Sequence, residues 1–146
     1  MTLQREPIFQ ALFALAQGAS WGEPAVGFAY AARRVRLFDD LPATPALCQA
    51  EHEETVEQLA GQPPRRRLSA AWIVHHSTGD PDATPATTNN LILDALDAAL
   101  HPDSPDGGCT LGGLVAHAWI EGKVFKDPGD LDGRALMVVP VMVLVP

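Results

Sequence analysis

The chain ends in twelve consecutive apolar or proline residues, Ala135 to Pro146, and five of them are valine. Valine is β-branched and favours strands. The run is too short to cross a membrane as a helix, which takes about 20 residues. Left unpaired, such a segment would be prone to aggregate, so it has to be held in a sheet. The run therefore predicts a final strand that is either buried on both faces or paired with another subunit.

Length and charge narrow the class of protein. The chain of 146 residues is long enough for a hydrophobic core, and we expect a single domain over residues 1–146. The formal net charge of −8 excludes a protein that holds DNA by its phosphates, because the electrostatic term would be repulsive. Basic side chains nevertheless gather at residues 33–36 and 65–67, as solvated strand ends or as contacts for an acidic partner.

The cysteines and the first residues indicate where the protein works. Cys48 and Cys109 lie far apart in the chain and form no metal-binding or redox motif. Acid and proline precede any apolar stretch at the N-terminus, which is unlike a secretory signal peptide. We therefore expect an intracellular protein with reduced thiols.

Two segments have the periodicity of amphipathic helices. Residues 4–17 and residues 89–100 each carry apolar side chains at a spacing of three to four, which places them on one stripe. Gly18 is well placed to end the first helix. Thr87 or Thr88 is the expected N-cap of the second.

Alternation of apolar and polar residues predicts the strands, and their order gives the fold class. Residues 45–54 also fit a short helix, although Pro45 favours a strand. The expected strands are residues 28–37, 45–54, 65–77, 114–126 and the C-terminal run, with loops at 19–27 and 58–64 and turns at 38–42, 78–85 and 126–133. The last turn should join the last two strands in a hairpin. We expect an α+β domain, a mostly antiparallel sheet of about four to five strands with two helices packed on it.

No residue pattern indicates a catalytic centre. Neither a nucleophile motif nor a phosphate-binding glycine loop is present. His75 and His76 are adjacent in a strand, so they point to opposite faces and cannot ligate one ion together. One histidine with Asp80 and Asp82 is conceivable as a metal site, but no spacing matches a known ligand set. The aspartates of residues 127–133 suit a hairpin turn, because a calcium loop requires a later bidentate glutamate. We expect no enzyme, no metal and no cofactor.

Seven segments, spread over nearly the whole chain, carry a resemblance to a known family. They are Glu6–Phe13, Arg33–Asp40, Thr78–Thr87, Leu111–Val115, His117–Lys123, Lys126–Gly133 and the apolar C-terminal run. In order and extent they resemble the small tail-terminator, or minor tail, proteins of long-tailed bacteriophages and prophages. The likeness rests on no single chemical signature.

The resemblance implies a structural virion protein. Proteins of this family are small α+β domains that assemble into a hexameric ring. The ring caps the finished tail tube, ends polymerisation of the tube protein and presents a surface to the head-tail connector protein. DNA passes through the lumen without being read, and no membrane is involved. The expected location is the tail or neck of the virion, after assembly in the cytoplasm of the host bacterium.

A closed ring needs two different, complementary patches on each subunit. The charge pattern suggests basic Arg33, Arg34 and Arg36 on one side. Acidic residues of a neighbour, Glu51, Glu53 and Glu54, would form the other and supply polar selectivity. A second candidate contact is the loop of residues 78–87, which carries Asp80 and Asp82 and equally suits a plain connector.

Three other functions remain open on the sequence. One is a different neck or head-tail connector protein of the same particle. Another is a small metal-dependent hydrolase that uses His76, Asp80 and Asp82. The third is a free-standing cytoplasmic binding module, which a ligand-sized apolar pocket in a stable monomer would support.

Overall fold

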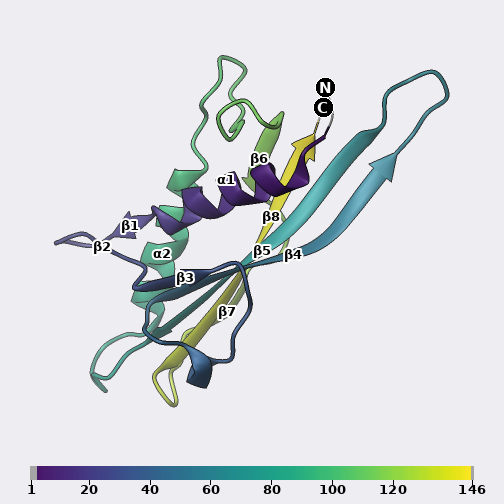
Figure 1. The fold of residues 1–146 in the computed structure, drawn as a ribbon. Coiled ribbons are helices and arrows are strands. Elements are labelled where there is room, and N and C mark those ends of the chain that lie inside the picture. The colour runs from purple at the N-terminus through teal and green to yellow at the C-terminus, as the bar shows by residue number, and fades with distance from the viewer. Residues whose placement is uncertain (1–2, 146) are drawn as a thin grey trace.

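A sheet of six strands, covered on one face by two helices, forms the framework (Figure 1). The computed structural model describes residues 3–145. The helices are α1 (Arg5–Gln17) and α2 (Ala86–Ala99), and a short 3-10 turn, η1, spans Phe38–Asp40. The strands are β1 (Ser20–Trp21), β2 (Val26–Gly27), β3 (Tyr30–Ala32), β4 (Ala46–Glu57), β5 (Arg65–Ser77), β6 (His117–Ile120), β7 (Phe125–Asp127) and β8 (Arg134–Val145).

The sheet has the order β3-β4-β5-β8-β6, and β7 pairs with β8 on the same side as β6. Only β3 and β4 are parallel. β1 and β2 form a separate two-stranded hairpin. The predicted α+β class, with a mostly antiparallel sheet and two helices, is confirmed, and the main sheet has six strands rather than four to five.

Both helices pack on the face of the sheet that carries Trp72. This side chain is fully buried, and its indole Nε1 donates to Gln49 Oε1 over 3.0 Å. Gln49 Nε2 in turn donates to the carbonyl of Phe9 in α1, also over 3.0 Å. A buried amide without partners would be costly, so this chain of bonds fixes α1 against β4 and β5.

The helix boundaries differ from the expectation mainly at the start of α2. The first helix is confirmed to within one residue, and Gly18 forms its C-cap. The second begins at Ala86 with Pro85 as N-cap, and neither Thr87 nor Thr88 caps it. Pro85 already has helical dihedral angles, which suit proline in a first turn, so the threonines lie inside the helix.

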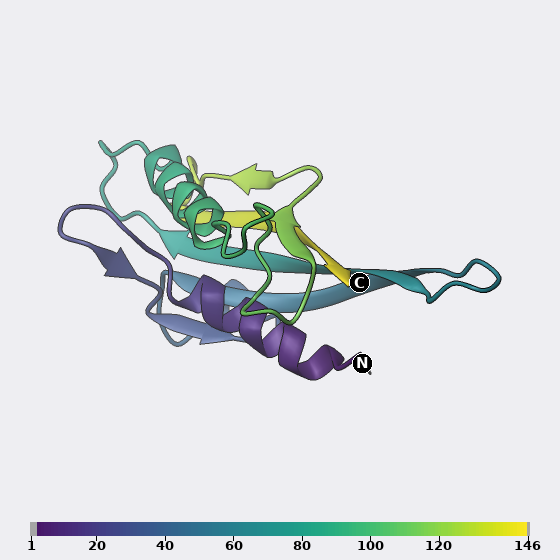
Figure 2. The same cartoon turned by 90° about the horizontal axis from the view of Figure 1, so that it is seen from above.

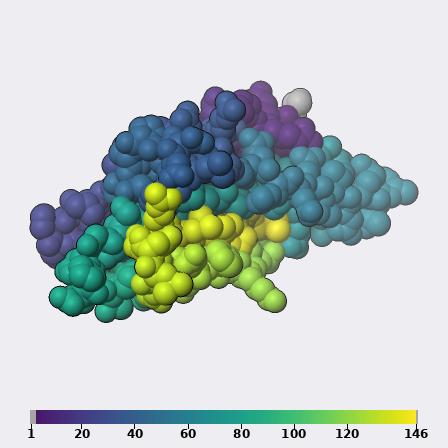
Figure 3. Space-filling view, turned by 90° about the horizontal axis from the view of Figure 1, so that it is seen from below, coloured from purple at the N-terminus to yellow at the C-terminus, as the bar shows by residue number. Residues whose placement is uncertain are grey.

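The C-terminal run forms β8 as far as Val145, and β8 pairs with β5 along its whole length, whereas Pro146 lies outside the described residues. From Ala135 onward its side chains alternate strictly between buried and half-buried. The buried set faces the helices, as expected for a core strand. The half-buried set, Leu136, Val138, Pro140, Met142 and Leu144, lies on the opposite face, which Figure 3 shows from below with β8 in yellow. Of the two expected alternatives, burial on both faces is therefore wrong for this face, and pairing with another subunit stays a prediction.

The strand predicted over residues 114–126 is wrong, because two short strands, β6 and β7, replace it. They pair with β8 on either side of Pro140, whose carbonyl accepts from the amide of Glu121 over 3.2 Å. The main-chain groups of Pro140 thus face this edge, and proline has no N–H with which to continue the ladder. Gly122, with φ of 109°, turns the chain at this point.

The strand predicted over residues 28–37 is mostly wrong, because β3 covers only Tyr30–Ala32. The chain bends at residues 33–34, where the side chain of Arg33 turns toward α1 and β4. The loop expected over residues 19–27 contains the β1–β2 hairpin, whose Trp21 packs edge-on against Phe28 at 5.0 Å between ring centroids.

Replacing Gly133 by alanine is expected to destabilise the turn between β7 and β8 by about 2 kcal/mol or more. Gly133 has φ of 74°, and an added Cβ would lie 2.3 Å from the carbonyl oxygen of Thr78. Gly61→Ala is the matched control, since φ is 77° there and nothing lies within 4 Å of an added Cβ. Urea unfolding measures both, and equal losses would contradict the steric explanation.

Candidate assembly surfaces

The tip of the β4–β5 hairpin extends past Val145 of β8, which pairs with Arg66 (Figures 1 and 2). We call residues 51–67 the arm. Every residue from 51 to 63 is exposed, including Val56 at 52% and Leu59 at 54%. At the base of the arm the register shifts between Glu51 and Glu54, and Ser69 Oγ bonds both the amide and the carbonyl of Glu53. The sequence predicted the two strands but not their projection from the core.

The two strands of the arm carry opposite charge. The β4 strand holds Glu51, Glu53, Glu54 and Glu57, whereas the β5 strand begins with three arginines at residues 65–67. Glu57 lies directly opposite Arg65, and Thr55 opposite Arg67. Cross-strand pairing of unlike charges favours the hairpin. It also gives the arm one acidic and one basic side.

The outer edge of β4 is open along the arm. β3 pairs only with Ala46 to Cys48, and no other strand within residues 3–145 pairs with β4 on that side. From residue 49 onward β4 therefore presents main-chain groups along an edge lined by glutamates. Natural sheets protect such edges with charge and bulges, and this edge has both.

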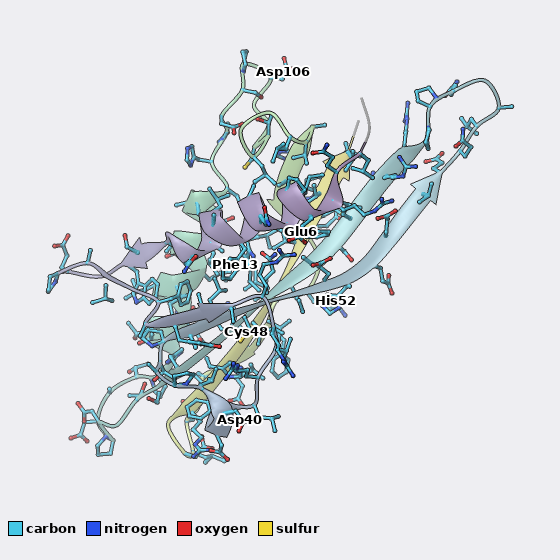
Figure 4. All side chains as sticks on the ribbon, viewed as in Figure 1. Glu6, Phe13, Asp40, Cys48, His52 and Asp106 are labelled. Atoms are coloured by element: carbon cyan, nitrogen blue, oxygen red, sulfur yellow. The ribbon has the colours of Figure 1, made fainter. Side chains whose placement is uncertain are left out.

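Three of the predicted interface residues form ion pairs within the chain. Arg33 contacts Glu6 at 2.6 Å and Glu51 at 2.9 Å, and Arg5 contacts Glu54 at 2.6 Å. Hydrogen bonds from Arg33 lower the pKa of Glu6, and those from Arg5 lower the pKa of Glu54. Figure 4 shows Glu6 on α1 and His52 on β4, the strand that carries Glu51 and Glu54. Arg33, Glu51 and Glu54 therefore join elements within one subunit rather than facing only a neighbour.

Arg34 and Glu53 are in a different position. Both are exposed, and within the described residues neither side chain forms an ion pair or a side-chain hydrogen bond. Arg36 lies over the ring of Tyr30 at 5.4 Å and donates to the Asp40 carbonyl over 3.4 Å. The exposed residues 34–37 alternate arginine with Val35 and Leu37, which are 51% and 76% exposed.

The loop with Asp80 and Asp82 lies at the other end of β5 from the arm tip (Figure 1). Both aspartates are exposed. The amide of Asp82 donates to Asp80 Oδ1 over 2.9 Å, an Asx turn that shapes the loop. The structure thus separates this pair from the charged residues of the arm.

The two adjacent histidines point to opposite faces, as predicted. His76 is 2% exposed and its Nε2 lies 2.7 Å from Asn89 Oδ1 in α2, whereas His75 meets the ring of Phe38 at 5.9 Å between centroids. Burial lowers the pKa of both histidines. Among residues 3–145 no group of three or more His, Cys, Asp or Glu side chains is arranged to hold a metal ion.

A groove lies where the arm meets the end of β8. Its volume is ≈ 440 Å³. Its lining combines the apolar Pro63, Pro64 and Leu144 with the charged Glu57, Arg65 and Arg67. Sequence reasoning missed this groove, because its lining residues from the β4–β5 hairpin, Ala116 and the end of β8 meet only in the folded sheet.

The chain matches no protein-family model and no curated protein. In the described part of the chain, neither α1 nor α2 is long and apolar enough to span a membrane.

Proposed function

We propose that this chain is a structural protein of a long-tailed bacteriophage that caps the tail tube as a ring. The hexameric ring ends polymerisation of the tube protein and provides the attachment surface for the head-tail connector protein. The subunits assemble in the cytoplasm of the host bacterium and stay in the tail or neck of the virion. On this proposal the chain is no enzyme and needs no cofactor. The proposal starts from the tail-terminator resemblance of the sequence segments.

The arm is the observation that carries the proposal furthest. An exposed two-stranded extension with an open edge contributes little to the core of its own subunit. Such an edge is a template for pairing with another chain. Its acidic β4 side and basic β5 side differ, so a contact through it joins two unlike patches, the arrangement that closes into a ring.

Two further observations support an assembling protein. Five apolar side chains of β8 stay half-buried on the face away from the helices, beside Phe125, which is 56% exposed. Apolar area of this kind commonly marks a contact surface. The net charge of −8 suits subunits around a channel through which DNA slides without binding.

Electron microscopy of the purified protein mixed with purified tail tubes tests the proposal. We expect a ring-shaped cap of density at one end of each tube and tubes that no longer elongate when tube protein is added. Tubes alone and tubes with an unrelated acidic protein serve as controls. Binding to isolated heads and not to tubes would indicate the connector protein instead. A monomer that binds neither would refute a role in the particle.

The groove favours one other function, a binding module. Its volume lies within the range of about 300–1,000 Å³ that is typical of ligand sites, and it combines apolar walls with two arginines. The groove is open at the base of an exposed arm, which is unlike the enclosed pockets of small-molecule carriers. A persistent monomer whose thermal unfolding temperature rises with a small anionic apolar ligand would favour this function.

A further inference from the structure

We propose that residues 34–37 of one copy add as a short strand to the open edge of β4 in the arm of the next copy. The inference rests on the proposed ring, and names the contact that would hold the ring together. The occupant is a second copy of this chain, argued from charge and from the side-chain alternation of two segments that lack a partner strand.

The first segment has the side-chain alternation of a strand but forms no strand in the subunit. Arg34, Val35, Arg36 and Leu37 alternate basic and apolar side chains, which is typical of a strand with one charged face. In the subunit all four are exposed and belong to no strand. β3 stops at Ala32, and the chain bends at residues 33–34. The sequence pattern therefore predicts a strand at these four residues, whereas the isolated subunit forms none there.

The second segment is a strand without an outer neighbour. Seven consecutive residues of β4, from 51 to 57, are exposed, and no strand within residues 3–145 lies on their outer side. The register with β5 places Thr55 and Glu57 on one face and Val56 on the other. Adding the segment 34–37 in a parallel register that sets Arg34 beside Glu53 would also set Leu37 beside Val56.

The negative charge of the open β4 edge determines which segment of a second copy fits it. Two β4 edges side by side would place glutamate against glutamate, which is unfavourable. The opposite edge of the sheet is short, with four residues in β6 and three in β7, and Gly122 interrupts it. The basic segment 34–37 is the exposed, extended partner of opposite charge. Its pairing with a different patch on the next copy is a heterologous contact.

The experiment uses two charge reversals in the full chain, Arg34→Glu and Glu53→Arg. Neither side chain has an ion-pair or side-chain hydrogen-bond partner within the described residues, so both variants should fold. Each variant alone places like charges in every contact, and we expect its self-association to weaken by roughly tenfold or more. The mass in solution, measured by light scattering, reports this.

Mixing the two variants gives the decisive result. In a ring that alternates them, the glutamate introduced at position 34 of one subunit meets the arginine introduced at position 53 of its neighbour. The next contact joins the native Arg34 to the native Glu53, so every contact regains unlike charges. We expect the equimolar mixture to recover the assembly of the native chain. A mixture that stays as dissociated as its components would overturn the proposal.

A disulfide cross-link tests the register of the proposed contact. It also detects the contact if the chain assembles only on tail tubes. Leu37→Cys in one preparation and Val56→Cys in the other, mixed with or without tail tubes, should form a disulfide-linked dimer on oxidation. Cys48 and Cys109 are buried and should not interfere. Val26→Cys replaces Leu37→Cys in the control, because Val26 is also exposed, at 50%, but lies outside the proposed contact. Equal cross-linking of the control, or none in either condition, would refute the contact.

The two proposals fail in distinguishable ways. Caps on tail tubes without rescue or cross-linking leave the tail-terminator function in place and remove the strand addition. Rescue and cross-linking without binding to tubes leave the contact in place and remove the terminator function.

Discussion

Replacing Trp72 by alanine is expected to lower the free energy of unfolding by about 3–5 kcal/mol, the largest loss from any single side chain of the sheet. Trp72 is fully buried between the helices and the sheet, so truncation leaves a cavity there. It also removes the indole that donates to Gln49 Oε1, and Gln49 is 2% exposed. A buried acceptor without its donor adds to the loss. Urea unfolding at neutral pH measures the difference.

Two further variants separate the parts of this effect. Trp72→Phe keeps most of the volume but removes the donor, and should cost about 1–3 kcal/mol. It also keeps the prediction testable if the alanine variant does not fold. Trp119→Ala is the matched control, since Trp119 is half-buried in β6 and donates to the exposed Glu121. A loss at Trp119 as large as that at Trp72 would show that core burial is not the cause.

Acidification from pH 7.5 to 5.5 is expected to destabilise the protein through His75 and His76. Burial lowers the pKa of both below the ordinary 6.5. As the pH falls through 6.5, the unfolded chain takes up protons that the folded chain does not. Stability is therefore complete above 6.5 and declines below it, by at most about 1.4 kcal/mol per pH unit for each proton.

His76→Gln tests the contribution of the more deeply buried histidine. Asn89 Oδ1 can only accept, so His76 carries its proton on Nε2, and a glutamine amide can donate in its place. We expect the free energy of unfolding of the variant to depend less on pH between 7.5 and 5.5. The loss of stability at lower pH should remain. The loss at lower pH comes from carboxyls such as Glu6 and Glu54, whose lowered pKa places their effect on stability below pH 4.5. Identical slopes in the variant and the native chain would contradict the assignment.

Segments with strong periodicity could be predicted from the sequence, because their pattern arises from local geometry. The bounds of β5 were predicted without error, and α1 and the β7–β8 hairpin were close. The break between β6 and β7 could not be predicted, since it depends on Gly122 turning the chain beside the ring of Pro140 in β8. The prediction of Thr87 or Thr88 as N-cap of α2 was wrong because Pro85 already has helical dihedral angles.

The candidate interface shows the same division. The charged clusters were visible in the sequence, and so was the strand pattern of residues 34–37. Which charges are used within the subunit was not, because Arg33 meets Glu6 and Glu51 only after α1, β3 and β4 have packed. The arm could not be predicted either, because nothing in the sequence of residues 45–77 indicates which of them the rest of the chain leaves exposed.

β5 runs from the arm at one end to the loop with Asp80 and Asp82 at the other, and it is bonded to β4 on one side and β8 on the other. A pull on the arm along this strand would strain both ladders in shear, so many hydrogen bonds would resist together instead of breaking one by one. The same strand would carry a displacement of the arm across the subunit with little loss. A subunit built in this way is mechanically stiff along one axis, and that axis joins the arm to the loop with Asp80 and Asp82.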